Sequence, residues 1–315
     1  MNIKTAIITT MPVMALLFAS CSTKALYKEF YNSMDNAEAM SRAIERIRHS
    51  GDQSADRYVA EFNYYVNTAL IHSGMTTSTQ FPSSNENVEG EIYTLTDSTG
   101  TVAGYMYFTQ IWDSLKADSA LAVIDQGIAL HPDRLDMRYG KIHFCGELCR
   151  WQAFADAIHA TLDHTVAINK RWIFPDADAP VDTVLVEVML NYESRLFDAV
   201  TNARDSVSAM ANLARFRGVV EHMLRLYPDN LYNLNLMAVS HQLTGNHAEA
   251  LSWLLMAEKV DPRDGIVLSN IADTYHLLGD IANERIYLQK LLEVGDADLK
   301  ARARQNLDEL DKINQ

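Results

Sequence analysis

The chain has 315 residues, of which 41 are acidic and 27 are basic, and its formal net charge is −14 at neutral pH. A surface this acidic repels phosphate backbones, so nucleic acid is excluded as the expected partner. The same charge excludes a polybasic contact with anionic lipid headgroups.

The first element in chain order is a predicted secretion signal over residues 1–20. Lys4 precedes an apolar run, Ala6–Ala19, that is too short to span a bilayer comfortably. The run leads into Phe18-Ala-Ser-Cys21, which resembles a bacterial lipobox. The resemblance implies acyl chains on Cys21 that anchor the protein to a membrane. Because Ser22 follows, it also implies the outer membrane, where the periplasmic side is expected. An ordinary signal peptide with a cysteine nearby is the alternative.

Residues 21–90 are predicted to form a tether, a helical hairpin and a loop. The first helix is expected to begin at a cap on Ser33 or Asp35 and to reach about His49. The second is expected from about Ala55 to His72, because apolar side chains recur there every three or four residues. Residues 74–90 are rich in Ser, Thr and Asn and show no periodicity, so they are predicted to be a loop.

A β-hairpin insert is predicted over residues 91–109. Two runs of strand-forming residues, 91–96 and 101–108, flank the turn Asp97-Ser-Thr-Gly100. Because an isolated hairpin is barely stable in water, we expect it to lie against the helices.

Residues 110–315 are predicted to be helical repeats closed by a C-terminal capping helix, Ala297–Ile313. Near the C-terminus the chain repeats itself at an offset of 34 residues. The matching pairs are Pro228 and Pro262, Leu234 and Leu268, Ala238 and Ala272, Leu243 and Leu277, Gly245 and Gly279, Ala248 and Ala282, and Leu254 and Leu288. A fixed period of this length predicts stacked helical hairpins rather than one closed core.

The composition of the two clear copies resembles the tetratricopeptide repeat (TPR) family. Small residues allow the two helices of a pair to cross closely, large ones fill the groove, and proline ends the second helix. The first copy carries this pattern at Ala238, Gly245, Ala250, Leu254, Ala257 and Pro262. The second copy has Ala272, Tyr275, Gly279 and Leu288, with Glu284 where Ala is usual. The resemblance implies an all-α fold, a TPR-like α-solenoid of helical hairpins with a small inserted β-hairpin. With the lipobox, the chain is similar to periplasm-facing repeat lipoproteins of bacteria.

The same resemblance implies a non-enzymatic scaffold that binds a protein or peptide of the cell envelope on a concave face. The first helix of each pair lines that face, and the implied binding residues are Tyr232, Asn235, Asn270, Asp273 and His276. No basic residue stands beside the two asparagines in the sequence, so a lysine-based clamp for a C-terminal carboxylate is not expected. A solvated polar face is the alternative interpretation.

A carbohydrate- or small-ligand-binding lipoprotein is the alternative function. Trp172 and Phe174 lie in a predicted connection, residues 169–182, and are the candidate ligand-stacking aromatics. Packing of both rings against the helices is the other interpretation of the same residues.

No motif predicts catalysis, a cofactor or a metal site. Asp176, Asp178 and Glu187 have the spacing of a calcium loop, but Pro180 and Val181 stand where that loop needs an oxygen ligand and a glycine. The histidines lack the spacing of a zinc site.

Two cysteines, Cys145 and Cys149, lie four residues apart in one predicted helix. A bridge within a regular helix would strain the disulfide geometry, so we expect two small side chains on a packing face.

Overall fold

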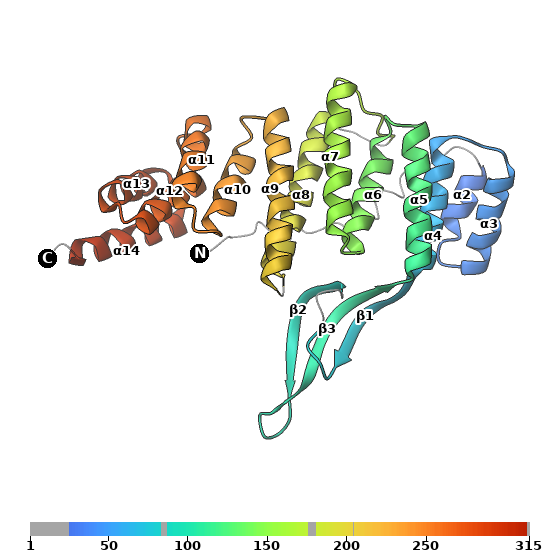
Figure 1. Cartoon of the computed structure of the whole chain (residues 1–315), viewed down its shortest axis with the longest axis horizontal. Helices are drawn as coiled ribbons and strands as arrows, with labels where there is room; N and C mark the ends of the chain where they lie inside the picture. The colour runs from blue at the N-terminus through green and yellow to red at the C-terminus, as the bar shows by residue number, and fades with distance from the viewer. Residues whose placement is uncertain (1–24, 83–86, 176–180, 204, 314–315) are drawn as a thin grey trace. The chain divides into compact units, whose positions relative to one another are not determined.

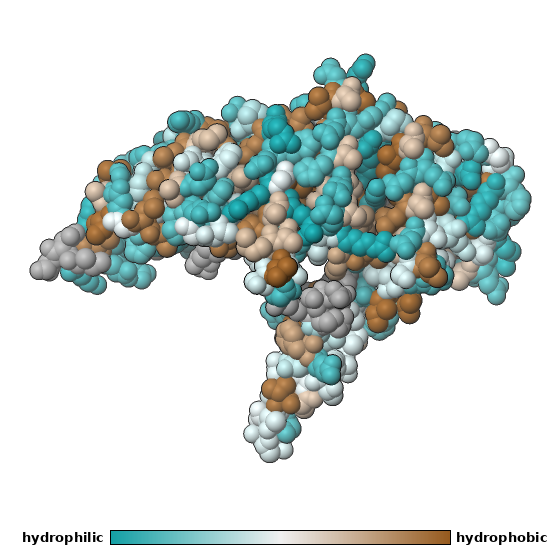
Figure 2. Space-filling model, viewed as in Figure 1, coloured by the Kyte–Doolittle hydropathy of each residue, from teal (hydrophilic) through white to brown (hydrophobic). Residues whose placement is uncertain are grey.

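The computed structural model describes residues 25–82, 87–175, 181–203 and 205–313 (Figure 1). The predicted signal, Cys21, and the candidate calcium positions Asp176 and Asp178 lie outside these ranges. The chain divides into two compact units, Met1–Ala209 and Met210–Gln315. Hydrophilic residues cover much of the visible surface, in keeping with the net charge of −14 (Figure 2). Within the described ranges, no helix combines the length and the apolar character needed to cross a bilayer.

The helices of the N-terminal unit pack as neighbours in chain order. They are α2 (Ala25–Asn32), α3 (Ala37–His49), α4 (Ala55–Ala69), α5 (Ser114–Leu130), α6 (Leu135–Glu147), α7 (Trp151–Ala167) and α8 (Val181–Thr201). The predicted first helix is confirmed as α3, but its cap is neither Ser33 nor Asp35. Asn36 caps it, since the side chain of Asn36 accepts a hydrogen bond from the Ala39 amide at 3.0 Å.

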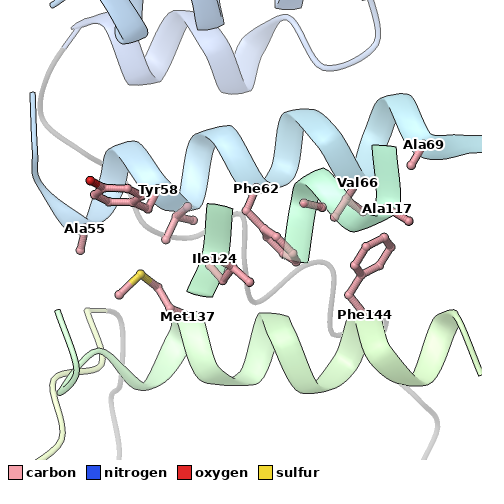
Figure 3. Packing of buried hydrophobic residues seen from close by; sticks show 11 residues of the cluster. Ala55, Tyr58, Phe62, Val66, Ala69, Ala117, Ile124, Met137 and Phe144 are labelled. Atoms are coloured by element: carbon pink, nitrogen blue, oxygen red, sulfur yellow. The ribbon is translucent and has the colours of Figure 1, made fainter. Parts of the chain in front are cut away.

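The core of this unit lies where α4, α5 and α6 meet. Phe62 of α4 packs edge-on against Phe144 of α6, with ring centroids 5.7 Å apart, and Ile124 of α5 is fully buried beside them (Figure 3). The contacting side chains recur along α4 at helical spacing, which explains why its periodicity was readable in the sequence. A second cluster, which includes Tyr27, Phe30 and Ile44, joins α2, α3 and α4.

A three-stranded antiparallel sheet is inserted between α4 and α5. Its strands are β1 (Leu70–Ser78), β2 (Asn87–Thr96) and β3 (Val102–Trp112), in the spatial order β1-β3-β2. The predicted hairpin is confirmed as β2 and β3. Its turn is held by the Asp97 carboxylate, which accepts from the Thr99 and Thr101 amides at 2.8 and 3.0 Å.

Three expectations about this region are wrong. The helix predicted to reach His72 ends at Ala69, and much of the predicted loop over 74–90 is strand. The sheet also does not lie against the helices. It extends away from the ends of α4 and α5 (Figure 1) and is joined to them at its base, where the Asp113 amide donates to the Ala69 carbonyl at 2.7 Å. The third strand supplies the support that a two-stranded hairpin would otherwise need from the helices.

The C-terminal unit contains the two clear repeats. After α9 (Ser206–Leu226) come the hairpin of α10 (Leu231–Gln242) and α11 (His247–Val260), the hairpin of α12 (Gly265–Leu278) and α13 (Ile281–Val294), and α14 (Ala297–Ile313). The small repeat residues Ala238, Ala250, Ala257 and Ala272 are all buried. Ala303 and Leu310 of α14 are buried as well, which fits its predicted packing face. The all-α fold of TPR-like helical hairpins is thereby confirmed.

Candidate functional site

The candidate site lies on α10, α12 and α14, which are successive first helices in the C-terminal unit. Side-chain caps set where α10 and α12 begin: Asn230 accepts from the Asn233 amide at 3.0 Å, and Asp264 accepts from the Val267 amide at 2.8 Å. Leu234 and Leu268, one period apart, point into the core of the unit. The other side of each helix is therefore left to present the predicted binding residues.

The structure brings Asn235 and Asn270 together. The Nδ2 group of Asn270 donates to the Oδ1 atom of Asn235 at 2.7 Å, and both side chains are half-buried. A second bond joins the same two helices, from Gln242 Nε2 to Thr274 Oγ1 at 2.7 Å. An amide side chain has two donor hydrogens and two acceptor lone pairs. The asparagine pair thus keeps donor capacity at Asn235 Nδ2 and acceptor capacity at Asn270 Oδ1, which matches the groups of a peptide backbone.

Asp273 is held by a basic residue that sequence reasoning missed. Arg302 of α14 donates through Nη2 to both carboxylate oxygens of Asp273, at 2.6 and 2.8 Å, and its Nη1 lies 3.4 Å from Ser269 Oγ. No signal in the sequence identified it, because the 34-residue period aligns position 302 with the buried Leu268 and so predicts a core residue there.

The Asp273–Arg302 pair contributes little to stability, and its main effect is to orient the Asp273 carboxylate. Both side chains are partly exposed, at 30 and 39 %. An ion pair of that exposure contributes about 0.2–1 kcal/mol. Its effect is to fix the carboxylate in one orientation and to neutralise it. We call Asn235, Asn270, Asp273 and Arg302 the polar row.

Tyr232 and His276 are not part of the polar row. Tyr232 lies in the first turn of α10 and is 44 % exposed. His276 is near the end of α12 and turns toward α13, where its Nδ1 atom lies 3.1 Å from Glu284 Oε1. Glu284 is buried, so the residue that departs from the usual Ala is accommodated by this partner.

The aromatic pair proposed for a ligand is engaged in packing. Trp172 is 7 % exposed, its Nε1 donates to Thr165 Oγ1 at 3.2 Å, and the Arg138 guanidinium lies 5.2 Å from its ring centroid. Phe174 is half-buried edge-on against Tyr139, at 5.9 Å between ring centroids. Burial of Trp172 argues against its role as an exposed stacking surface and favours the packing interpretation.

The cysteines do not share a helix face as expected. Helix α6 ends at Glu147, so Cys149 lies beyond it with a φ of 52°, whereas Cys145 is buried within the helix. Burial raises the pKa of the Cys145 thiol to about 11, which keeps it protonated near neutral pH. In the part of the chain that the structure describes, no three His, Cys, Asp or Glu residues gather as a metal site would require.

Comparison with known proteins finds no matching family model and no matching curated protein. Solved structures with similar folds include a tetratricopeptide repeat protein from Parabacteroides merdae, 11 % identical, with a TM-score of 0.35 over 90 % of this chain and 86 % of that one. The assembly chaperone of RpL4 is 10 % identical, with a TM-score of 0.40 over 92 % and 98 % of the two chains. A thermophilic TPR protein of Thermus thermophilus is 16 % identical, with a TM-score of 0.39 over 61 % and 91 %.

Proposed function

We propose that this chain, whose C-terminal hairpins are tetratricopeptide-type repeats, is a non-enzymatic scaffold that binds an extended segment of another protein along the polar row. We further propose that acyl chains on Cys21 anchor it to the membrane of a bacterial envelope, on the periplasmic side of the outer membrane. The two parts are independent, since the first is argued from side-chain geometry and the second from the lipobox resemblance.

The observation that carries the binding proposal is the Asn270–Asn235 hydrogen bond between successive first helices. It orients two amide groups at a fixed spacing on one face of the unit. An extended segment offers N–H and C=O groups that would otherwise be left to water. Recognition of backbone groups by oriented amides requires no charge on the partner, and the ion pair between Asp273 and Arg302 keeps the adjoining surface close to neutral.

The surroundings of the row fit a binding role. Tyr232 is exposed beside it on α10, and an aromatic side chain with a polar tip supplies contact area at little entropic cost. The polar row is itself half-buried, so its side chains are held in place before a partner arrives. Preorganisation of this kind reduces what binding costs in side-chain ordering.

Site-specific crosslinking tests the binding proposal. A photoreactive residue is placed at Asn235 or at Asp273 in the full chain, with Ser252, an exposed position on α11, as the matched control. We expect the first two positions to capture the same protein in the envelope and the control to capture none of it. Capture from the connection 169–182 with none from Asn235 and Asp273 would overturn the proposal.

Affinity measurements on the captured partner sharpen that test. Replacing Asn235 with Ala removes both the bond to Asn270 and one group for the partner. Loss of a satisfied polar contact of this kind costs about 1–1.5 kcal/mol, which corresponds to about ten-fold weaker binding. Ser252→Ala is the control and should bind as the unsubstituted chain does.

The anchor is tested separately by metabolic labelling with palmitate. The unsubstituted chain should incorporate label and fractionate with the outer membrane, and a Cys21→Ser variant should do neither. Label that persists in the variant would show that the lipid, if any, is attached elsewhere. Failure of this test leaves the polar row untouched.

A further inference from the structure

The projecting sheet has two edges of different chemistry. Since β3 is the central strand, β1 and β2 are both edge strands, whose outer backbone groups are open to another strand. None of the nine residues of β1 is buried, and Ile71 and Met75 are 66 and 52 % exposed. An edge of this kind is a template for pairing unless charge, proline or a covering element blocks it.

Strand β1 has little of the usual protection, because its one register shift lies between Leu70 and His72, at the end that joins α4. Its sequence, Leu-Ile-His-Ser-Gly-Met-Thr-Thr-Ser, contains no Asp, Glu, Lys, Arg or Pro. Strand β2, at the opposite edge, carries Glu89 and Glu91. In a chain with a net charge of −14, an uncharged edge of nine residues is the place where a second copy would meet the least repulsion.

One face of the sheet is also apolar and open. The register places Met75 beside Phe108, and Thr77, Met106 and Tyr93 in the next row on the same face. Tyr93 is exposed, as is Leu95, which follows it on this face. Figure 2 shows brown and near-white surface over much of the sheet. A strand added at β1 would extend this face.

We propose that β1 pairs with β1 of a second copy of this chain, in antiparallel orientation about a twofold axis. The two sheets then form one continuous six-stranded sheet. Each copy presents the same strand to the other, as an isologous interface requires. Pairing through β2 would instead set two acidic strands against each other, which is unfavourable.

The direction of pairing follows from where the helices lie. The helices join the sheet at Leu70 and Trp112, and the strands extend away from them (Figure 1). Antiparallel pairing puts the helices of the two copies at opposite ends of the joined sheet, whereas parallel pairing would bring them to the same end. The interface involves little more than one strand, so the dimer is expected to be weak and concentration-dependent. The inference does not depend on the proposed function.

Molar mass in solution tests it. The full chain in a mild detergent is run on a size-exclusion column with light scattering, over a concentration series reaching about 100 µM. We expect a shift from monomer to dimer that a Met75→Lys variant weakens about ten-fold or more, because a charge on the edge disfavours pairing. Leu95→Lys introduces the same charge at an exposed position on β2, so it is the matched control and should dimerise normally.

Three outcomes would overturn the proposal. The unsubstituted chain stays monomeric throughout the series, the dimer survives Met75→Lys, or Leu95→Lys disrupts it as strongly. Hydrogen exchange shows whether the variants still fold, since β3 should keep its protection in both. Amides of β1 should gain protection with concentration in the unsubstituted chain and in Leu95→Lys, but not in Met75→Lys.

Discussion

Gly279 shows how a single residue sets the geometry of a repeat. It ends α12 in the left-handed region, with a φ of 72°, and its amide donates to the His276 carbonyl at 3.0 Å. A side chain built at this position meets no atom within 4 Å. Any cost of adding one therefore comes from the backbone conformation and not from packing.

Replacing Gly279 with Ala should lower the free energy of unfolding of the C-terminal unit by about 1 kcal/mol, because Ala disfavours the left-handed region. Asn tolerates that region better, so Gly279→Asn should cost less. Denaturant unfolding of the two variants measures the difference. Equal losses in both would mean that a contact, and not the backbone, explains the glycine.

The packing of elements depends on small residues where helices cross. At Gly127 of α5, an added Cβ would stand 2.7 Å from Tyr58 Cβ of α4 and 3.0 Å from Met137 Sδ of α6. Three helices thus approach one another at a position where no side chain fits. The buried Ala238 and Ala272 in the C-terminal repeats have the same role, since their small side chains let helices pack closely.

A Gly127→Val substitution should destabilise the N-terminal unit by about 1–3 kcal/mol through overpacking. Gln126→Val, at the exposed neighbouring position of the same helix, should cost only the few tenths of a kcal/mol expected from helix propensity. Thermal unfolding of both variants provides the comparison. Similar losses of stability in the two variants would show that helix propensity, and not the close crossing of the helices at Gly127, explains the effect.

At the scale of the whole molecule, stability is distributed among neighbouring hairpins. In the C-terminal unit α11 packs against both α10 and α12, so each hairpin shares its apolar side with the next. In such a stack the free energy of unfolding is approximately the sum of the intrinsic stabilities of the repeats and of the interfaces between neighbours. A substitution that destabilises one helix should therefore also destabilise the helices packed against it.

Leu254→Ala, a truncation at a fully buried position of α11, should cost about 2–5 kcal/mol. Hydrogen exchange should show lost protection in α10 and α12 as well as in α11. Met256→Ala, at an exposed position of the same helix, should leave protection nearly unchanged. Loss confined to α11 would contradict the coupled stack.

Local patterns in the sequence by themselves determined most of the helices and the repeat. The 34-residue period, the buried alanines and the glycine at the end of α12 are all readable because they act within one hairpin. Helical periodicity was readable for the same reason, since it reports one face of one element.

Only the tertiary structure decided the third strand and the completed polar row. Strand β1 exists because it pairs with β3, for example Ser73 with Gln110, and its Ser- and Thr-rich sequence has no strong pattern of its own. The basic partner of Asp273 is Arg302 of α14, which lies 29 residues further along the chain. In both cases the deciding contact joins residues far apart in sequence, and a contact of that kind leaves little trace in local periodicity.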